Sequence, residues 1–205
     1  MAKQYAFYIN SSACSGCKTC QVACKDKHDL DVGILWRRVY EVSGGDWIQD
    51  GDAWTPNVFA YYVSISCNHC EEPICVSSCP TKALHKRKDG IVMINQKKCI
   101  GCRYCEWACP YSALQYDSDS GTMTKCHLCY DHIDQGNSPA CVTACPMRAL
   151  DFGELGTLQE KYGRLNEVYP LPRANLTKPA LVIRSHKDAV HARKENASIT
   201  NKEEI

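Results

Sequence analysis

Sixteen cysteines are the sequence feature that most restricts how this chain can fold. They fall into four groups of four, and none of the sixteen is left over. The first and third groups follow the pattern C-x2-C-x2-C-x3-C, whereas the second widens one gap to four residues and the fourth widens one gap to eleven. The groups are Cys14, Cys17, Cys20 and Cys24; Cys67, Cys70, Cys75 and Cys79; Cys99, Cys102, Cys105 and Cys109; and Cys126, Cys129, Cys141 and Cys145. Such regular grouping indicates sites that each need four thiols.

Three kinds of site could use four thiols. A disulfide framework is typical of small secreted domains, but the start of the chain, MAKQYAFYIN, lacks the charged and apolar regions of a secretory signal. Structural zinc usually takes two separate pairs of cysteines, and only the fourth group could be fitted to that pattern. Iron–sulfur clusters are bound by C-x2-C-x2-C-x3-C-P in bacterial ferredoxins. We therefore favour clusters, and a zinc-stabilised interaction scaffold is the alternative from a different class.

The spacing of the cysteines suits a four-iron cluster. Three thiolates two residues apart lie on one short curled loop, and the N–H groups of that loop can point at the cluster. Gly16 and Gly101 suit such a path because glycine tolerates a positive φ. The fourth cysteine of each group is expected to ligate the neighbouring cluster, as in two-cluster ferredoxins. Cys24 departs from the pattern because Lys25, and not proline, follows it.

Exchange of the fourth cysteine within each pair of groups predicts four sets of metal ligands. The sets are Cys67, Cys70, Cys75 and Cys109; Cys99, Cys102, Cys105 and Cys79; Cys14, Cys17, Cys20 and Cys145; and Cys126, Cys129, Cys141 and Cys24. Because every set already has four cysteines, we expect His69 and His127 to lie beside the sites or at the surface, and not to be ligands. Tyr104 and Trp107 are expected to shield a cluster from water.

Internal repeats predict the domain organisation. CPTKAL, CPYSAL and CPMRAL share the form C-P-x-x-A-L, and each is expected to begin a short helix. Residues 67–116 are similar to a complete two-cluster ferredoxin, with a turn at Asp89-Gly90. Residues 3–25 and 124–153 are expected to form an outer unit of the same kind. The predicted fold is α+β, with two ferredoxin-like two-cluster units, one inserted in the other.

The remaining segments are accessory to these units. Residues 26–66 are predicted to be a β insertion, because residues 34–42 and 57–66 are rich in β-branched and aromatic side chains. Residues 154–183 are predicted to be an extended C-terminal segment with one short helix, TLQEKYGRL. The charged and polar tail at 184–205 is expected to be disordered.

Charge and hydropathy exclude several functions. The formal net charge of +1 gives no reason to expect nucleic acid as a partner. No stretch approaches the roughly eighteen apolar residues of a membrane span.

No catalytic Ser/His/Asp arrangement or phosphate-binding glycine loop is found, so we expect a non-catalytic protein with no cofactor-binding residues beyond the cluster ligands. The basic run Lys82, His85, Lys86, Arg87 and Lys88 is expected to be a solvated loop, with partner docking as the alternative.

In its four groups and their order, the chain resembles the four-cluster ferredoxin-type iron–sulfur subunits of bacterial membrane-bound molybdenum oxidoreductases. The resemblance covers roughly residues 3–183 and rests on CSGCKTCQVACKD, CIGCRYCEWACPY and MTKCHLCYD. The stretches RRVYEVSGGDW, NVFAYYVSISCNHCEEPIC and PLPRANLTKP are similar to the B subunits of anaerobic dimethyl sulfoxide reductases. Nitrate reductase relatives replace one cysteine of the third group by tryptophan and hold a three-iron cluster. That position is Cys102 here, so the resemblance implies four [4Fe–4S] clusters.

The resemblance also implies an electron-transfer subunit. Such a subunit would receive electrons from a quinol-oxidising integral membrane anchor subunit and pass them to a molybdopterin-containing catalytic subunit that reduces sulfoxides or N-oxides in anaerobic respiration. It would lie peripherally on the bacterial cytoplasmic membrane through the anchor subunit, on the periplasmic face. An equivalent subunit of a formate dehydrogenase, hydrogenase or polysulfide reductase complex is the alternative with the same chemistry.

Overall fold

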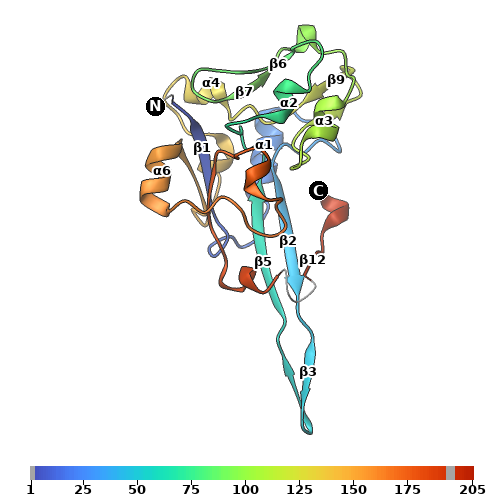
Figure 1. The fold of residues 1–205 in the computed structure, drawn as a ribbon, viewed down its shortest axis with the longest axis vertical. Helices are drawn as coiled ribbons and strands as arrows, with labels where there is room; N and C mark the ends of the chain where they lie inside the picture. The colour runs from blue at the N-terminus through green and yellow to red at the C-terminus, as the bar shows by residue number, and fades with distance from the viewer. Residues whose placement is uncertain (1–2, 193–196) are drawn as a thin grey trace.

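The computed structural model describes residues 3–192 and 197–205, in which short helices and strands are joined by long loops (Figure 1). The strands are β1 (Tyr5–Asn10), β2 (Arg38–Gly44), β3 (Trp47–Asp50), β4 (Ala53–Pro56), β5 (Phe59–Ile65), β6 (Leu84–Lys86), β7 (Val92–Ile94), β8 (Gln115–Asp117), β9 (Thr122–Thr124), β10 (Leu150–Glu154), β11 (Leu181–Arg184) and β12 (Ser198–Ile199). The α-helices are α1 (Thr19–Lys27), α2 (Ile74–Ser77), α3 (Tyr104–Ala108), α4 (Tyr130–Ile133), α5 (Ala140–Thr143) and α6 (Leu155–Tyr162). The 3-10 turns are η1 (Gln96–Lys98), η2 (Ala174–Leu176), η3 (Lys187–Val190) and η4 (Lys202–Glu204). The fold is α+β, as predicted.

Strand β1 is buried on both of its faces. It pairs antiparallel with β10 and parallel with β11. Phe7 and Ile9 belong to a core shared with β2 and β5, whereas Ala6 and Tyr8 pack with residues of α6. Successive side chains of a strand point to opposite faces, so a strand covered on both sides needs a continuous apolar run such as YAFYIN. The pairing of β1 with β10 brings the first and fourth cysteine groups together.

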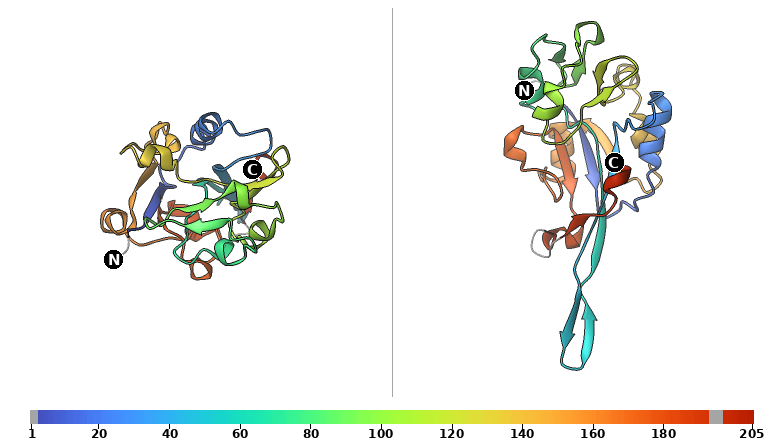
Figure 2. Two further views of the ribbon diagram at one scale, coloured as in Figure 1. Left: turned by 90° about the horizontal axis from the view of Figure 1, so that it is seen from above. Right: turned by 90° about the vertical axis from the view of Figure 1, so that its right-hand side faces the viewer.

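Strands β2 and β5 form the long hairpin expected from residues 34–42 and 57–66. Their antiparallel register runs from Arg38 opposite Ile65 to Gly44 opposite Phe59. The segment between them forms a second hairpin, β3–β4, which projects far beyond the rest of the molecule (Figures 1 and 2). The expected hairpin is confirmed, and this projecting extension of it was not predicted.

Two pairs of short helices carry many of the cysteines. Helix α1 packs against α5, and helix α2 packs against α3. Cys20 and Cys24 lie in α1, Cys141 in α5, Cys75 in α2 and Cys105 in α3. Among the described residues, none of the helices has the length and continuous apolar character needed to cross a bilayer.

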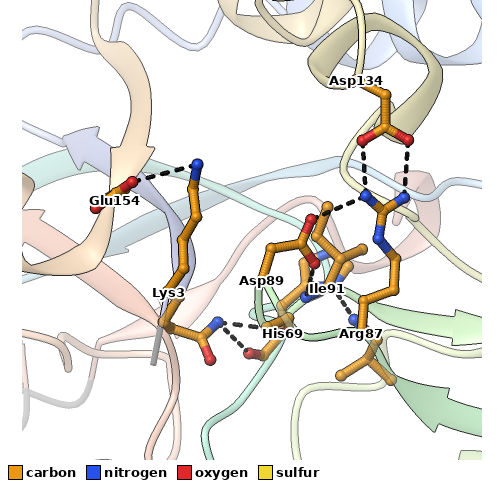
Figure 3. Close-up of polar contacts among 10 residues, drawn as sticks. Lys3, His69, Arg87, Asp89, Ile91, Asp134 and Glu154 are labelled. Carbon is orange, nitrogen blue, oxygen red and sulfur yellow. Dashed lines mark hydrogen bonds and ion pairs between the residues drawn. The ribbon is translucent and has the colours of Figure 1, made fainter. Parts of the chain in front are cut away.

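The basic loop is tied to other parts of the chain (Figure 3). The Arg87 guanidinium donates hydrogen bonds to both carboxylate oxygens of Asp134, at 2.6 and 3.0 Å, and to Asp89 at 2.9 Å. Lys86 Nζ donates to the backbone carbonyl of Cys70 at 2.9 Å. These contacts correct the expectation that the whole run is a solvated loop. They hold it against α4 and the second cysteine group.

The C-terminal tail differs from the expectation of disorder. Strand β12 pairs with the edge of β2, and Asn201 is buried beside it. The Asn201 amide donates to the Val39 carbonyl at 2.9 Å and accepts from the Glu41 N–H at 2.9 Å. Backbone pairing at an open strand edge can order a polar segment that has no apolar core of its own. The part of the prediction that concerns residues 193–196 lies outside the described residues.

Candidate metal centres

The structure brings the sixteen cysteines together in four sites. Site I is formed by Cys14, Cys17, Cys20 and Cys145; site II by Cys24, Cys126, Cys129 and Cys141; site III by Cys67, Cys70, Cys75 and Cys109; and site IV by Cys79, Cys99, Cys102 and Cys105. In each site one thiol comes from the other group of the pair. All sixteen are free thiols. Each grouping holds the same cysteines as one of the predicted ligand sets, and that these cysteines bind metal stays a prediction.

The four cysteine loops share one backbone conformation. The residue before the second cysteine has a positive φ in every group, namely 71° at Gly16, 43° at His69, 65° at Gly101 and 60° at Leu128. A residue of positive φ between residues of negative φ turns successive N–H groups to one side. These groups then line a concave site that favours negative charge. The conformation was predicted at both glycines, but it is strained at His69 and Leu128. Both residues are buried, and the His69 Nδ1 accepts a hydrogen bond from the Val92 N–H at 3.0 Å.

The C-P-x-x-A-L repeats do not begin helices, so that prediction is wrong. The residue before the alanine has a positive φ in all three, at 54°, 48° and 51°. The chain therefore turns back, and the N–H of the alanine donates to the cysteine that begins the repeat. The distances are 3.2 Å from Ala83 N to Cys79 Sγ and 3.3 Å from Ala149 N to Cys145 Sγ. Such bonds stabilise a thiolate ligand.

The arrangement of the thiols fits a cluster better than a single ion. Sites I, III and IV are each lined by four cysteines and by mostly apolar side chains, whereas a zinc ion needs all four sulfurs about 2.3 Å from one point. Within residues 3–192 and 197–205, no three His, Cys, Asp or Glu side chains are arranged to hold one metal ion. Asn68 lines the site III cavity, and its buried Nδ2 has no hydrogen-bond partner in the described chain. A cluster sulfide is a suitable acceptor for this donor.

Burial keeps most of these thiols protonated until metal binds. It raises the pKa of Cys14, Cys105 and Cys129 to about 11 each. Because the thiolate is the form that binds metal, iron must displace these protons when the site is loaded. Cys17 is exposed and differs, because the Thr19 hydroxyl donates to its sulfur at 3.3 Å and lowers its pKa.

A buried arginine lies between sites I and II. Arg37 is 1% exposed, its guanidinium donates to the hydroxyls of Ser64 and Ser66 at 3.1 and 3.0 Å, and it stacks 4.4 Å from the Phe7 ring centre. No carboxylate of the described residues pairs with it. Burial alone would lower the pKa of Arg37, but the thiols of both sites raise it above its ordinary value. Sequence analysis did not identify Arg37, because nothing in the sequence distinguishes it from the adjacent Arg38.

A buried lysine has the corresponding place between sites II and III. Lys125 Nζ donates to the carbonyl oxygens of Val92 and Cys126, at 2.5 and 2.7 Å. Burial raises the pKa of Cys126 to about 12, the neighbouring Cys67 adds to the rise, and Lys125 opposes it. At Cys75, burial again raises the pKa and Lys125 again opposes the rise. Lys125 therefore supplies positive charge to two sites at once.

These contacts arrange the four sites in a row. Burial raises the pKa of Cys20 in site I, and the nearby Cys141 of site II contributes to the rise. Burial likewise raises the pKa of Cys126 in site II, and the nearby Cys67 of site III contributes to the rise. Cys75 of site III and Cys105 of site IV belong to one buried cluster. The order is therefore I, II, III, IV.

Aromatic rings border site II on one side. His28 Nε2 lies 3.3 Å from Cys129 Sγ. The ring of His127 is 4.7 Å from that of His28, 5.1 Å from that of Trp36 and 4.9 Å from that of Tyr130, measured between ring centres. Burial lowers the pKa of His28 to about 4, so this ring is neutral at pH 7. His127 thus lies beside the site, one of the two places expected for it.

The aromatic residues next to site IV do not act as the expected shield. Trp107 is 74% exposed and Tyr104 is 53% exposed, and their ring centres lie 5.8 Å apart. Ile100, which lines the site IV cavity, is also exposed. Ile100, Tyr104 and Trp107 are thus exposed apolar side chains on the segment that carries the third cysteine group, and gathered exposed apolar side chains mark interaction sites.

Comparison with known proteins identifies the family. Residues 58–155 match the family described as a 4Fe-4S dicluster domain. The chain is 56% identical over 184 residues to the B subunit of anaerobic dimethyl sulfoxide reductase from Escherichia coli (strain K12), and the match covers 90% of each protein. It is 50% identical over 205 residues to the probable anaerobic dimethyl sulfoxide reductase subunit YnfG of the same organism, with both proteins covered in full. It is 37% identical over 187 residues to the B subunit of polysulfide reductase from Wolinella succinogenes, and this match covers 89% of the present protein and 95% of the relative. The protein therefore belongs to the family of ferredoxin-type iron–sulfur B subunits that includes those of anaerobic dimethyl sulfoxide reductase.

Proposed function

We propose that the chain is the electron-transfer subunit of a respiratory reductase complex. It would receive electrons from a quinol-oxidising membrane anchor subunit and deliver them to a molybdopterin catalytic subunit that reduces sulfoxides or N-oxides. The observation that carries this proposal is the row of four four-cysteine sites. Electron tunnelling weakens steeply with distance, so a subunit that connects two partners needs closely spaced carriers between them.

The sixteen cysteines of sites I to IV are the proposed ligands of four [4Fe–4S] clusters. When bound, the clusters supply one-electron carriers whose potentials depend on hydrogen bonds, charge and solvent exposure. Sites III and IV would belong to an inserted unit at 67–116, and sites I and II to an outer unit at 3–25 and 124–153. The pairing of β1 with β10 supports this division because it joins the two ends of the outer unit. Residues 26–66 and 154–183 would then be the β insertion and the C-terminal extension.

The protein's own groups would tune the sites. The N–H donors of the cysteine loops, the side chain of Asn68 and the charges of Arg37 and Lys125 all favour the more negative, reduced state. Burial of the thiols keeps water from the sites and strengthens each of these interactions.

The surface next to site IV is the proposed contact with the anchor subunit. Ile100, Tyr104 and Trp107 present apolar side chains there, and aromatic side chains are enriched in the cores of protein interfaces. Through this contact the chain would be held on the cytoplasmic membrane, on its periplasmic face. Site IV would then receive electrons, and site I would pass them on.

The test is to purify the intact complex without oxygen and to follow cluster absorbance and EPR. A reduced quinol analogue should reduce the clusters, and dimethyl sulfoxide or trimethylamine N-oxide should then reoxidise them. Because the B subunit of polysulfide reductase is among the relatives, polysulfide is the necessary comparison. Reoxidation by polysulfide alone would favour the alternative complex, as would formate- or hydrogen-dependent reduction. Stoichiometric zinc without sulfide would favour the scaffold and refute the relay.

A further inference from the structure

The β3–β4 hairpin is an arm with no core of its own. All eight residues of its two strands are exposed, and it extends away from the body as a continuation of β2 and β5 (Figures 1 and 2). A two-stranded hairpin alone is only marginally stable in water. Its open edges also offer unpaired backbone groups to any strand that approaches. An arm of this kind indicates a partner that covers it.

One face of the arm carries both of its tryptophans. Trp47 lies opposite Pro56, and Gln49 lies opposite Trp54. Alternate residues of a strand share a face, so Trp47 and Trp54 lie on the same side, as diagonal neighbours. They are 58% and 59% exposed. Tryptophan is the residue type most enriched in the centres of protein interfaces, where it fills pockets in the partner.

The charge of the arm argues against a lipid surface as the partner. Asp46, Asp50 and Asp52 lie on or beside it, and no lysine, arginine or histidine occurs from residue 39 to residue 68. Segments that lie on anionic membranes carry lysine and arginine on their polar side. Three aspartates without a basic residue would be repelled there. The arm instead suits a protein groove that is apolar in its centre and basic at its rim.

The arm is attached at the end of the row that carries site I. Along β5 the chain leaves the arm at Phe59, and Ser64 then lines the site I cavity. Between them, the Tyr62 ring lies against the site I loop, because a Cβ placed on Gly16 would come within 2.5 Å of it. Cys67 of site III comes only after the strand ends. A partner that grips the arm would therefore lie over site I, away from the apolar surface of site IV.

We propose that the arm inserts into a groove of the catalytic subunit and holds that subunit over site I. This rests on the proposed function, in which the other partner is the anchor subunit at site IV. The two tryptophans are the anchoring side chains, and the aspartates pair with basic residues at the rim of the groove. The arm is thus a docking device for one partner only.

The first test uses the intact complex with matched tryptophan variants. Replacing Trp47 and Trp54 by serine should reduce retention of the catalytic subunit by about tenfold or more when the complex is purified through a tag on the iron–sulfur chain itself. Trp107→Ser removes another exposed tryptophan, from the site IV end, and should retain the catalytic subunit in full. Unchanged iron and sulfide contents would show that the variant chains are folded. Full retention of the catalytic subunit by the double variant would overturn the proposal.

The second test is photo-cross-linking from within the complex. A benzoylphenylalanine in place of Ile48, which is half exposed on the other face of the arm, should cross-link to the catalytic subunit. Cross-links to the anchor subunit or to lipid would overturn the proposal. Failure of the proposed function looks different, because the chain would then co-purify without a molybdopterin protein or without clusters. If the arm proposal alone is wrong, the unaltered chain still co-purifies with a molybdopterin protein and with clusters, and so does the double tryptophan variant.

Discussion

At the scale of single residues, the most informative feature is positive charge buried without a carboxylate. Among the described residues, the partners of Arg37 are hydroxyls, a carbonyl and an aromatic ring, and a buried charge without a counter-charge is strongly unfavourable. The negative charge that balances it must come from the sites on either side. Arg37 thereby links the stability of the fold to the loading of sites I and II.

Replacing Arg37 by glutamine should make the clusters of sites I and II harder to reduce. A unit charge about 8 Å away contributes about 2 kcal/mol at an effective dielectric constant of roughly 20. This corresponds to on the order of 90 mV for a one-electron couple, at about 59 mV per tenfold change. EPR-monitored redox titration should show both midpoint potentials shifted downward by tens of millivolts. The midpoint potentials of sites III and IV should differ from those of the unaltered protein by no more than the error of the titration.

Two control variants separate charge from packing at Arg37. Arg37→Lys keeps the charge, so the midpoint potentials of sites I and II should stay close to those of the unaltered protein. Arg164→Gln removes an exposed charge and should leave all four potentials unchanged. Equal shifts at all four sites, or none at sites I and II, would contradict the placement of this charge.

Replacing Cys102 by serine should damage site IV alone. Cys102 lies in site IV, at the far end of the row from sites I and II, and a hydroxyl is a poorer ligand for iron than a thiolate. Spin quantification after full reduction should show one altered cluster, with the signals of sites I and II intact. Selective loss at sites I and II would refute both the ligand sets and the order of the sites.

At the scale of elements, the sequence predicted the cysteine loops better than their neighbours. Glycine at Gly16 and Gly101 indicated a positive φ, which the structure has. The same conformation at His69 and Leu128 could not be predicted, because nothing in those side chains favours it and packing in the fold imposes it. The C-P-x-x-A-L repeats resemble helix starts, but an N–H to sulfur contact takes the place of the first helical turn.

Replacing Gly101 by alanine should disrupt site IV. Its φ is 65°, and a Cβ there would lie 2.3 Å from the Gly121 carbonyl oxygen. Gly136 is the matched control, because its φ is 81° and a Cβ would meet nothing within 4 Å. Gly136→Ala should therefore cost only the backbone strain, about 1 kcal/mol, and leave the iron content unchanged. Chemical analysis should find iron lost from the Gly101 variant only; equal loss in both variants would mean that contact with Gly121 is unimportant.

At the scale of the whole molecule, the chain is a row of sites with a different surface at each end. The gathering of the cysteines into four groups of four could be predicted, since cysteine spacing is local in the sequence. The projecting arm, the ordered tail and the buried cations could not, because each depends on contacts between distant segments. Asn201 shows this well, since one amide holds a polar tail against β2 from more than a hundred residues away in sequence.

Native mass spectrometry of the chain, released without oxygen from its purified complex, tests the four-cluster assignment most directly. Four clusters predict a mass above that of the polypeptide by four iron and four sulfide ions for each of the four sites. Serine in place of any one ligand should reduce that excess by a single cluster or part of one. An excess that corresponds to zinc, or to fewer than four clusters in the unaltered protein, would contradict the assignment.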